Sequence, residues 1–212
     1  MKIEIPGKDF DGRHLGDIIS IIQNNLNADF FYAHSECLCC GNDCRECAKQ
    51  VLELLGMSHK LTDDDSDAIK GTETWEDKNW DHSQYLKAKI TNSQKENYLA
   101  YQFDARSSYR KLPYKKEIDS FLSQFEGNLV DVGESSKLNI KEKFEIVDCA
   151  FCYIGVDSGI THLALMSTTP IIVMQNKEHP RQIFYPYSNQ LKFFTNHVDV
   201  LEHIKSLKIK LI

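Results

Sequence analysis

The chain has 212 residues, of which 42% are hydrophobic and 26% are charged, with a formal net charge of -6. This composition supplies enough apolar residues for one large domain or two small ones with packed cores, and it excludes an intrinsically disordered chain. Lysine and arginine are scattered through both halves, so there is no basic stripe of the kind that binds a phosphate backbone. We therefore expect no nucleic-acid partner.

The N-terminal sequence MKIEIPGKDFDGRHLGD contains no apolar core of signal-peptide length. Nowhere does an uncharged run approach the roughly 20 residues that span a bilayer. We therefore expect a cytoplasmic protein without a membrane span. The seven cysteines then predict reduced thiols or a bound metal, because disulfides persist mainly in oxidising compartments.

The first half of the chain predicts elements in the order β, α, β, α. The expected strands are 2–5 and 28–34, and the expected helices are 15–26 and 47–57. The second helix is expected to stop near Gly56. The stretch 62–96 is polar and acidic with few apolar positions, which is typical of a surface excursion or a linker. Residues 1–95 are therefore predicted to form an N-terminal lobe.

From residue 97 onward, predicted strands and helices alternate. The expected strands are 97–103, 128–133, 151–156 and 170–175, and the expected helices are 115–125, 141–150, 160–167 and 198–207. Strands that alternate with helices form βαβ units, whose strands pair in a parallel sheet. The sequence therefore predicts an α/β fold with a C-terminal lobe of residues 96–212.

The segment YIGVDSGITHLAL places Asp157, Ser158 and Gly159 where a predicted strand ends and a helix begins. Ligands of an open parallel sheet bind outside the carboxyl ends of its strands. Gly159 permits close approach of a ligand to the backbone, and Ser158 can cap a helix whose first N–H groups suit a phosphate. Asp157 is better suited to ribose or sugar hydroxyls, so the motif predicts a nucleotide-sugar site. The alternative is that it only caps a helix and that His162 is a packed core residue.

The run FEIVDCAFCYIGVDSGITHLALMSTTPIIVM resembles the donor-binding end of glycosyltransferase family 9, the heptosyltransferase family of GT-B enzymes. The matching positions are Asp157, Ser158, Gly159, His162, Leu163, Ala164 and Pro170. The resemblance implies two Rossmann-like lobes and transfer of a hexose or heptose from a nucleotide-diphosphate sugar, without a metal for the chemistry. It also implies that the Asp-Ser-Gly motif and His162 bind the donor.

A second stretch, NYLAYQFDARSSYRKLPYKKEIDSFLSQF, resembles the segment that opens the family's second domain. In the family, a polar loop with a basic residue holds the donor's diphosphate at this point. The resemblance therefore implies donor binding by residues of this loop, namely Arg106, Ser107, Ser108, Arg110 and Lys111. Whether Arg110 or Lys111 corresponds to the family's basic residue is open.

The opening stretch GRHLGDIISIIQ is similar to the family's first loop, in which an acid after a glycine activates the acceptor hydroxyl. The resemblance implies that Asp17 is the catalytic base, although the family's usual Thr-Pro a few residues later is missing. The alternative is that Asp17 only places a favourable charge in the first turn of a helix.

Family members are longer than this chain, and the shortfall lies in the N-terminal lobe that would bind the acceptor. The acceptor is therefore unknown, with a saccharide favoured. A chain with a reduced first lobe could also be a non-catalytic nucleotide-sugar-binding protein, in which Asp17 is dispensable.

The run CLCCGNDCREC predicts a possible structural zinc site, because four thiolates can surround one tetrahedral centre. The candidate ligands are Cys37, Cys40, Cys44 and Cys47. The first cysteines are closer together than in a usual zinc pair, so the alternative is a set of reduced, partly buried thiols at a helix start. A zinc-stapled interaction protein is accordingly a third functional hypothesis. Cys149 and Cys152 fall in an apolar run and are expected in the core.

Overall fold

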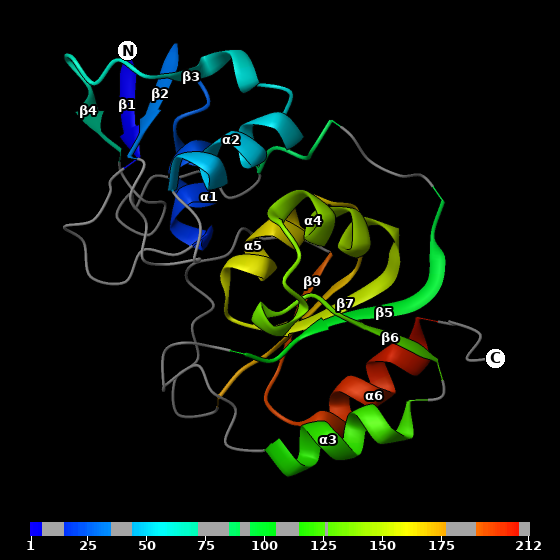
Figure 1. Cartoon of the computed structure of the whole chain (residues 1–212). Coiled ribbons are helices and arrows are strands. Elements are labelled where there is room, and N and C mark those ends of the chain that lie inside the picture. The colour runs from blue at the N-terminus through cyan, green and yellow to red at the C-terminus, as the bar shows by residue number, and fades with distance from the viewer. Residues whose placement is uncertain are drawn as a thin grey trace. The chain divides into compact units, whose positions relative to one another are not determined.

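The computed structural model describes residues 1–5, 15–34, 44–71, 85–89, 94–104, 115–125, 127–176 and 190–207. These residues form two compact units (Figure 1). Unit 1 contains the described residues up to 89, and unit 2 contains those from 94 onward.

The described part of unit 1 is built on a four-stranded parallel sheet of order β3-β2-β1-β4. Its elements are β1 (Lys2–Ile5), α1 (Leu15–Asn24), β2 (Phe30–Ala33), α2 (Cys44–Leu54), the 3-10 helix η1 (Ser58–Lys60), β3 (Leu61–Thr62) and β4 (Ile69–Lys70). The predicted order β, α, β, α is confirmed for the first four elements. The chain adds β2 and β3 on one side of β1 and then adds β4 on the other side. The order of the strands therefore reverses between β1 and β4, which is a topological switch point.

Helix α2 ends at a glycine, as the sequence predicts. Gly56 has a φ of +68°, a conformation that L side chains rarely adopt. The Met57 N–H donates to the Leu52 carbonyl at 2.7 Å, and the Gly56 N–H donates to the Glu53 carbonyl at 2.9 Å. These two bonds satisfy carbonyls that the helix itself leaves open, and they turn the chain towards η1.

The acidic segment after α2 corrects one expectation, because β3 and β4 lie within or beside the stretch predicted to be only an excursion or a linker. Ile69 pairs with Ile3 of β1, and Leu61 pairs with Phe31 of β2. Each of these strands has two residues. They leave no apolar periodicity for sequence reasoning to detect.

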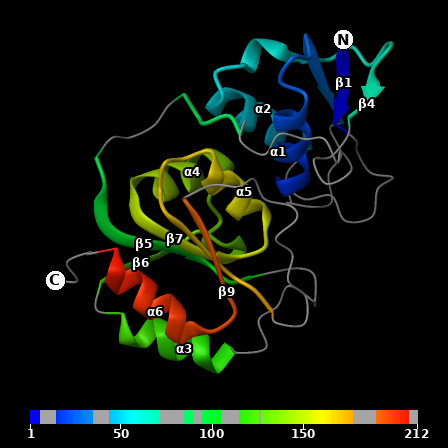
Figure 2. The same ribbon diagram turned by 180° about the vertical axis from the view of Figure 1, so that it is seen from behind.

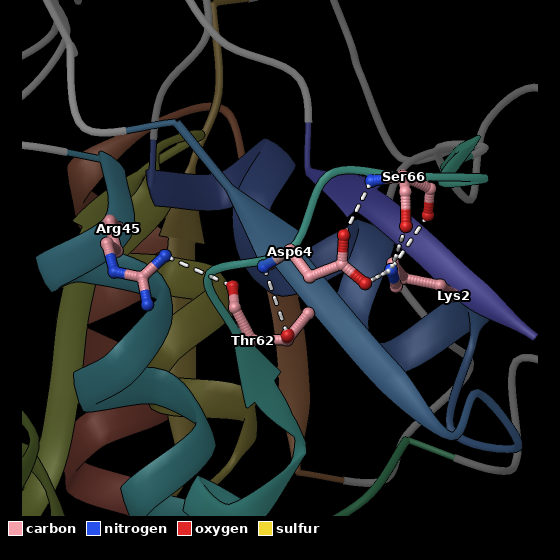
Figure 3. A network of polar contacts seen from close by, with 5 residues as sticks. All are labelled: Lys2, Arg45, Thr62, Asp64 and Ser66. Atoms are coloured by element: carbon pink, nitrogen blue, oxygen red, sulfur yellow. Dashed lines mark hydrogen bonds and ion pairs between the residues drawn. The ribbon is translucent and has the colours of Figure 1, made fainter.

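Polar contacts hold the turn between β3 and β4 (Figure 3). The Lys2 ammonium donates to the Asp64 carboxylate at 2.5 Å and to the Ser66 carbonyl at 2.7 Å, and the Ser66 N–H donates to Asp64 at 2.9 Å. These hydrogen bonds hold the pKa of Asp64 well below its usual range. On the other side, the Arg45 guanidinium of α2 donates to the Thr62 carbonyl at 3.1 Å. The acidic segment is thus tied to both β1 and α2.

Unit 2, as far as it is described, is built on a five-stranded parallel sheet of order β6-β5-β7-β8-β9. Its elements are β5 (Glu96–Gln102), α3 (Lys115–Gln124), β6 (Asn128–Asp131), the 3-10 helix η4 (Glu134–Ser136), α4 (Ile140–Cys149), β7 (Ala150–Val156), α5 (Gly159–Leu165), β8 (Ile171–Met174), β9 (Leu191–Phe194) and α6 (His197–Ser206). All eight elements predicted for this lobe are present. The strand β9 was not predicted, because Lys192 interrupts its four residues.

Helices α3 and α6 lie on one face of this sheet, and α4 and α5 lie on the other (Figures 1 and 2). The core between the sheet and α3 and α6 contains Leu99, Ile118, Phe125, Cys152, Ile154, Val156, Ile172, Met174, Val200 and Ile204. Because side chains alternate along a strand, Tyr153 and Gly155 of β7 face α4 and α5. Cys149 and Cys152 are buried, as predicted.

The predicted α/β class with two Rossmann-like, parallel units is confirmed. Within the described ranges, no helix combines the length and apolar character that crossing a bilayer requires.

Candidate functional site

The strand order of unit 2 defines a switch point between β5 and β7. From β5 the chain goes to β6 on one side, and through α4 it returns to β7 on the other side. In doubly wound sheets of this order, ligands bind outside the carboxyl ends of the strands at the switch point. Asp157, Ser158 and Gly159 follow β7 directly and therefore lie at this point of the sheet.

Ser158 is the N-cap of α5, as the sequence predicts. Its backbone is extended, with a φ of -155°, and its hydroxyl accepts from the Thr161 N–H at 3.4 Å. The Ser158 carbonyl also accepts from the Thr161 N–H, at 3.1 Å. Part of the first turn of α5 is therefore already bonded internally, and the helix has only seven residues. Ser158 therefore caps α5, which is compatible both with a motif that only caps the helix and with a ligand role for Asp157 and Gly159.

A buried polar network braces the turn from below, and it joins β7 to β5. The Ser158 hydroxyl donates to Gln102 Oε1 at 2.7 Å, and the Tyr153 hydroxyl donates to the same oxygen at 3.4 Å. The Tyr153 hydroxyl also lies 3.3 Å from the hydroxyl of Thr161. Burial raises the pKa of Tyr153, so its phenol stays neutral and keeps its proton.

Gly155 provides the space that this network needs. A Cβ atom at Gly155 would lie 2.2 Å from the Tyr153 hydroxyl oxygen, which no side chain can tolerate. The tyrosine ring therefore lies over Gly155 on the face of the sheet that carries α4 and α5.

The network fixes what the Ser158 hydroxyl can do for a ligand. A hydroxyl has one proton to donate, and Ser158 donates its proton to Gln102. In this arrangement Ser158 can accept a hydrogen bond from a ligand but cannot donate one to a phosphate oxygen.

Gln102 was not predicted as a site residue, and its replacement should destabilise unit 2. We expect Gln102→Met, which keeps the volume but removes the amide, to cost about 2 kcal/mol and to lower the melting temperature by about 5 °C, because buried hydroxyls lose their acceptor. Differential scanning calorimetry measures this shift. The matched control is Gln50→Met, since the Gln50 amide bonds Glu46 one turn away within α2 and this pair should contribute a few tenths of a kcal/mol. Equal melting temperatures for the two variants would contradict the bracing role.

Three polar side chains are buried around the carboxyl ends of β7 and β8. Asp157 is 8% exposed, His162 is 9% exposed and Gln175 is 4% exposed. Val156 is paired with Met174, so the residues that follow them, Asp157 and Gln175, are neighbours across the sheet. His162 is buried on α5, which is the position that the packed-core alternative predicts.

The predicted basic loop cannot be placed in this site. Its residues, Arg106, Ser107, Ser108, Arg110 and Lys111, fall between β5 and α3, outside the residues that the structure describes.

Asp17 lies in unit 1, and its position fits both interpretations given above. It is the third residue of α1, directly in the first turn, and its side chain is partly buried. The helix starts after the carboxyl end of β1, next to the point where the strand order of unit 1 reverses.

Sequence reasoning missed an acid–histidine pair at the same edge of unit 1. His34 directly follows β2, and its Nε2 lies 2.8 Å from a carboxylate oxygen of Glu4 in β1. The Tyr32 ring packs edge-on against the imidazole, with centroids 5.1 Å apart. The pairing depends on which strands are neighbours, so no local sequence signal reveals it.

The cysteine cluster is only partly described. Cys44 and Cys47 lie in the first turn of α2 and are 2% and 1% exposed, whereas Cys37 and Cys40 fall outside the described residues. Among the residues that are described, no group of three or more histidine, cysteine, aspartate or glutamate side chains is arranged to hold a metal ion. The zinc site stays a prediction.

Comparison with known proteins supports the family resemblance. The family model "Glycosyltransferase family 9 (heptosyltransferase)" matches residues 43–210, a range that omits Asp17. No curated protein matches the chain.

Two solved structures share the fold. One is dodecameric, iron-containing heptosyltransferase TibC in complex with ADP-D-beta-D-heptose, with a TM-score of 0.56 and 11% identity. The other is the iron-containing dodecameric glycosyltransferase TibC from enterotoxigenic E. coli H10407, with a TM-score of 0.57 and 12% identity. Each likeness covers 92% of this chain and 62% of the other, so the chain spans about three fifths of these proteins.

The two parallel α/β units therefore correspond to a GT-B type fold. Because the family model matches well over half of the sequence, the chain belongs to glycosyltransferase family 9, the heptosyltransferase family.

Proposed function

We propose that this protein transfers a heptose or hexose from a nucleotide-diphosphate sugar to a hydroxyl of a saccharide acceptor. The observation that carries the proposal is the Asp157-Ser158-Gly159 turn at the switch point of unit 2, braced by Gln102. The TibC structure, which shares the fold, contains ADP-D-beta-D-heptose. A donor of this chemical class is therefore the first to test here.

In the proposed donor complex, Asp157 accepts hydrogen bonds from hydroxyls of the donor, and Gly159 lets the donor approach the backbone. The diphosphate is assigned to the basic loop, through Arg106, Ser107, Ser108 and either Arg110 or Lys111. Positive charge at this point stabilises the negative charge that develops on the departing diphosphate. We propose that these side chains, and not a metal ion, provide that stabilisation.

The proposed base is Asp17. As the acceptor oxygen attacks the anomeric carbon, its proton passes to the Asp17 carboxylate. The bond between the anomeric carbon and the diphosphate oxygen breaks, and the nucleoside diphosphate leaves with the bonding electrons. The position of Asp17 in the first turn of α1, after β1, supports this role.

A non-catalytic nucleotide-sugar-binding protein is the second candidate. It is favoured by the family match beginning at residue 43, beyond Asp17. The two candidates agree on the donor site and differ on whether Asp17 is needed.

The test of the proposed function is the release of nucleoside diphosphate from ADP-, GDP- and UDP-linked sugars in the presence of mono- and oligosaccharides. Transfer predicts release that depends on the saccharide, together with a glycosylated product. Donor binding without any such release favours the non-catalytic alternative.

The proposed location of the protein is the cytoplasm.

For the cysteine cluster we propose a structural metal without a role in the chemistry, and we expect stoichiometric zinc by elemental analysis. Two buried cysteines in one helical turn are a suitable half-site. Because both TibC structures are of an iron-containing enzyme, iron is measured in the same samples. Cys47→Ser should lose the metal, whereas Cys149→Ser, a control at a buried cysteine in unit 2, should retain it. A wild-type protein free of zinc and iron would contradict this proposal.

A further inference from the structure

Three glutamine side chains are equally buried in the part of the chain that the structure describes. Gln23, Gln102 and Gln175 are each 4% exposed. Both ends of the Gln23 amide are bonded, because its Nε2 donates to the Leu86 carbonyl at 2.9 Å and its Oε1 accepts from the Leu86 N–H at 2.8 Å. Gln102 uses both ends of its amide, donating to the Asp104 carbonyl and accepting from Ser158.

Gln175 differs from these two. Its Nε2 is buried and has no hydrogen-bond partner among the described residues. A buried donor without a partner costs about 1–3 kcal/mol, so a native protein retains one only where something repays the cost.

The position of Gln175 indicates what compensates for the cost of its unpaired donor. The residue follows β8 directly, and its N–H donates to the Phe194 carbonyl at 2.8 Å, which keeps the backbone extended beside β9. Met174 belongs to the core under α3 and α6, so Gln175 points to the opposite face of the sheet. Gln102 lies on that face too, where it accepts from Ser158, so the Gln175 side chain is directed towards the side of the sheet on which the donor turn is braced.

We propose that Gln175 is a donor-recognition residue, which binds one oxygen of a vicinal diol while Asp157 binds the neighbouring hydroxyl. The inference rests on the proposed function. Parallel strands lie about 4.8 Å apart, so the residues after β7 and β8 present an amide donor beside a carboxylate acceptor. Adjacent hydroxyls on a furanose or pyranose ring match this pair, because one hydroxyl can donate to Asp157 while the other oxygen accepts from Gln175.

The test is Gln175→Met, which keeps the side-chain volume and removes the amide. Affinities for ADP, GDP, UDP and their sugar-linked forms are measured by titration calorimetry. We expect the variant to bind about tenfold more weakly, as the loss of one hydrogen bond to a ligand predicts. We also expect its melting temperature without ligand to rise by about 2 °C, because an unpaired buried donor has been removed.

The matched control is Gln23→Met. Its amide is equally buried but bonded at both ends, so this variant should melt at a lower temperature than the wild type and bind the same ligands unchanged. If Gln175→Met is destabilised in the same way as Gln23→Met, the amide has a structural partner and the inference is overturned.

The panel also separates the two sources of a diol. If the variant binds both the free diphosphates and the sugar-linked forms more weakly, Gln175 is assigned to the ribose. If it binds only the sugar-linked forms more weakly, Gln175 is assigned to the transferred sugar. Unchanged affinity for a ligand that the wild type binds overturns the inference while the proposed function stands. A wild-type protein that binds no member of the panel overturns the proposed function, and this inference with it.

Discussion

Replacing Asp157 with asparagine is expected to weaken donor binding by about a hundredfold. Asparagine keeps the shape of the side chain but removes the charge and replaces one acceptor oxygen with a donor. A hydrogen bond to a charged group contributes about 1.5–3 kcal/mol, and loss of the acceptor also leaves a ligand hydroxyl facing an N–H group. Titration calorimetry with the donor that the wild type prefers measures the change.

The control for this variant is Asp148→Asn. Asp148 is a buried acid of the same unit, 1% exposed, but it lies at the end of α4, where β7 begins, on the opposite edge of the sheet. The control is expected to lose stability and to keep its donor affinity. If Asp157→Asn binds the donor as tightly as the wild type, Asp157 is only a turn residue and the donor site lies elsewhere.

The second large effect is expected at Asp17. Asp17→Asn should lower the turnover number for transfer by about 10³-fold, because an amide cannot take the proton of the acceptor hydroxyl. Donor affinity should be unchanged, since the donor site belongs to unit 2. The measurement compares product formation at saturating donor with the calorimetric dissociation constant for each protein.

A second first-turn acid separates catalysis from helix stabilisation. Glu46 occupies the first turn of α2, as Asp17 does in α1. Glu46→Gln should cost a few tenths of a kcal/mol through the helix dipole and leave turnover intact. An Asp17→Asn enzyme that behaves in the same way would show that Asp17 only stabilises α1, and it would favour the non-catalytic alternative.

Much of the fold could be predicted from the sequence because its signals are local. Each long strand of unit 2 is an apolar run next to an amphipathic helix, and Gly56 marks the end of α2. The turn at Asp157-Ser158-Gly159 could be predicted for the same reason, since β7, this turn and α5 follow one another in the chain. The strands β3 and β4 were missed because two residues leave no such pattern, and β9 was missed because Lys192 interrupts its apolar residues.

The residues that complete the site depend on contacts between distant parts of the chain. Gln102 is 56 positions from Ser158, and its role appears only when β5 is known to lie beside β7. The proximity of Asp157 to Gln175 depends on the register of β7 against β8, and the sequences of two apolar strands do not reveal their register. A polar residue at the end of an apolar strand, as at Gln102 and Gln175, is the one local signal that could have pointed to them.

The most direct test of a nucleotide-sugar site in unit 2 is a thermal-shift measurement of the wild-type protein with ADP-, GDP-, UDP-, CMP- and dTDP-linked sugars and their free nucleotides. A ligand at 100 times its dissociation constant adds about 2.7 kcal/mol of stability, which raises the melting temperature of a chain of this size by about 5 °C or more. We predict that one nucleotide class produces this rise. No shift with any member of the series would contradict the donor site and leave the family relationship as one of fold alone.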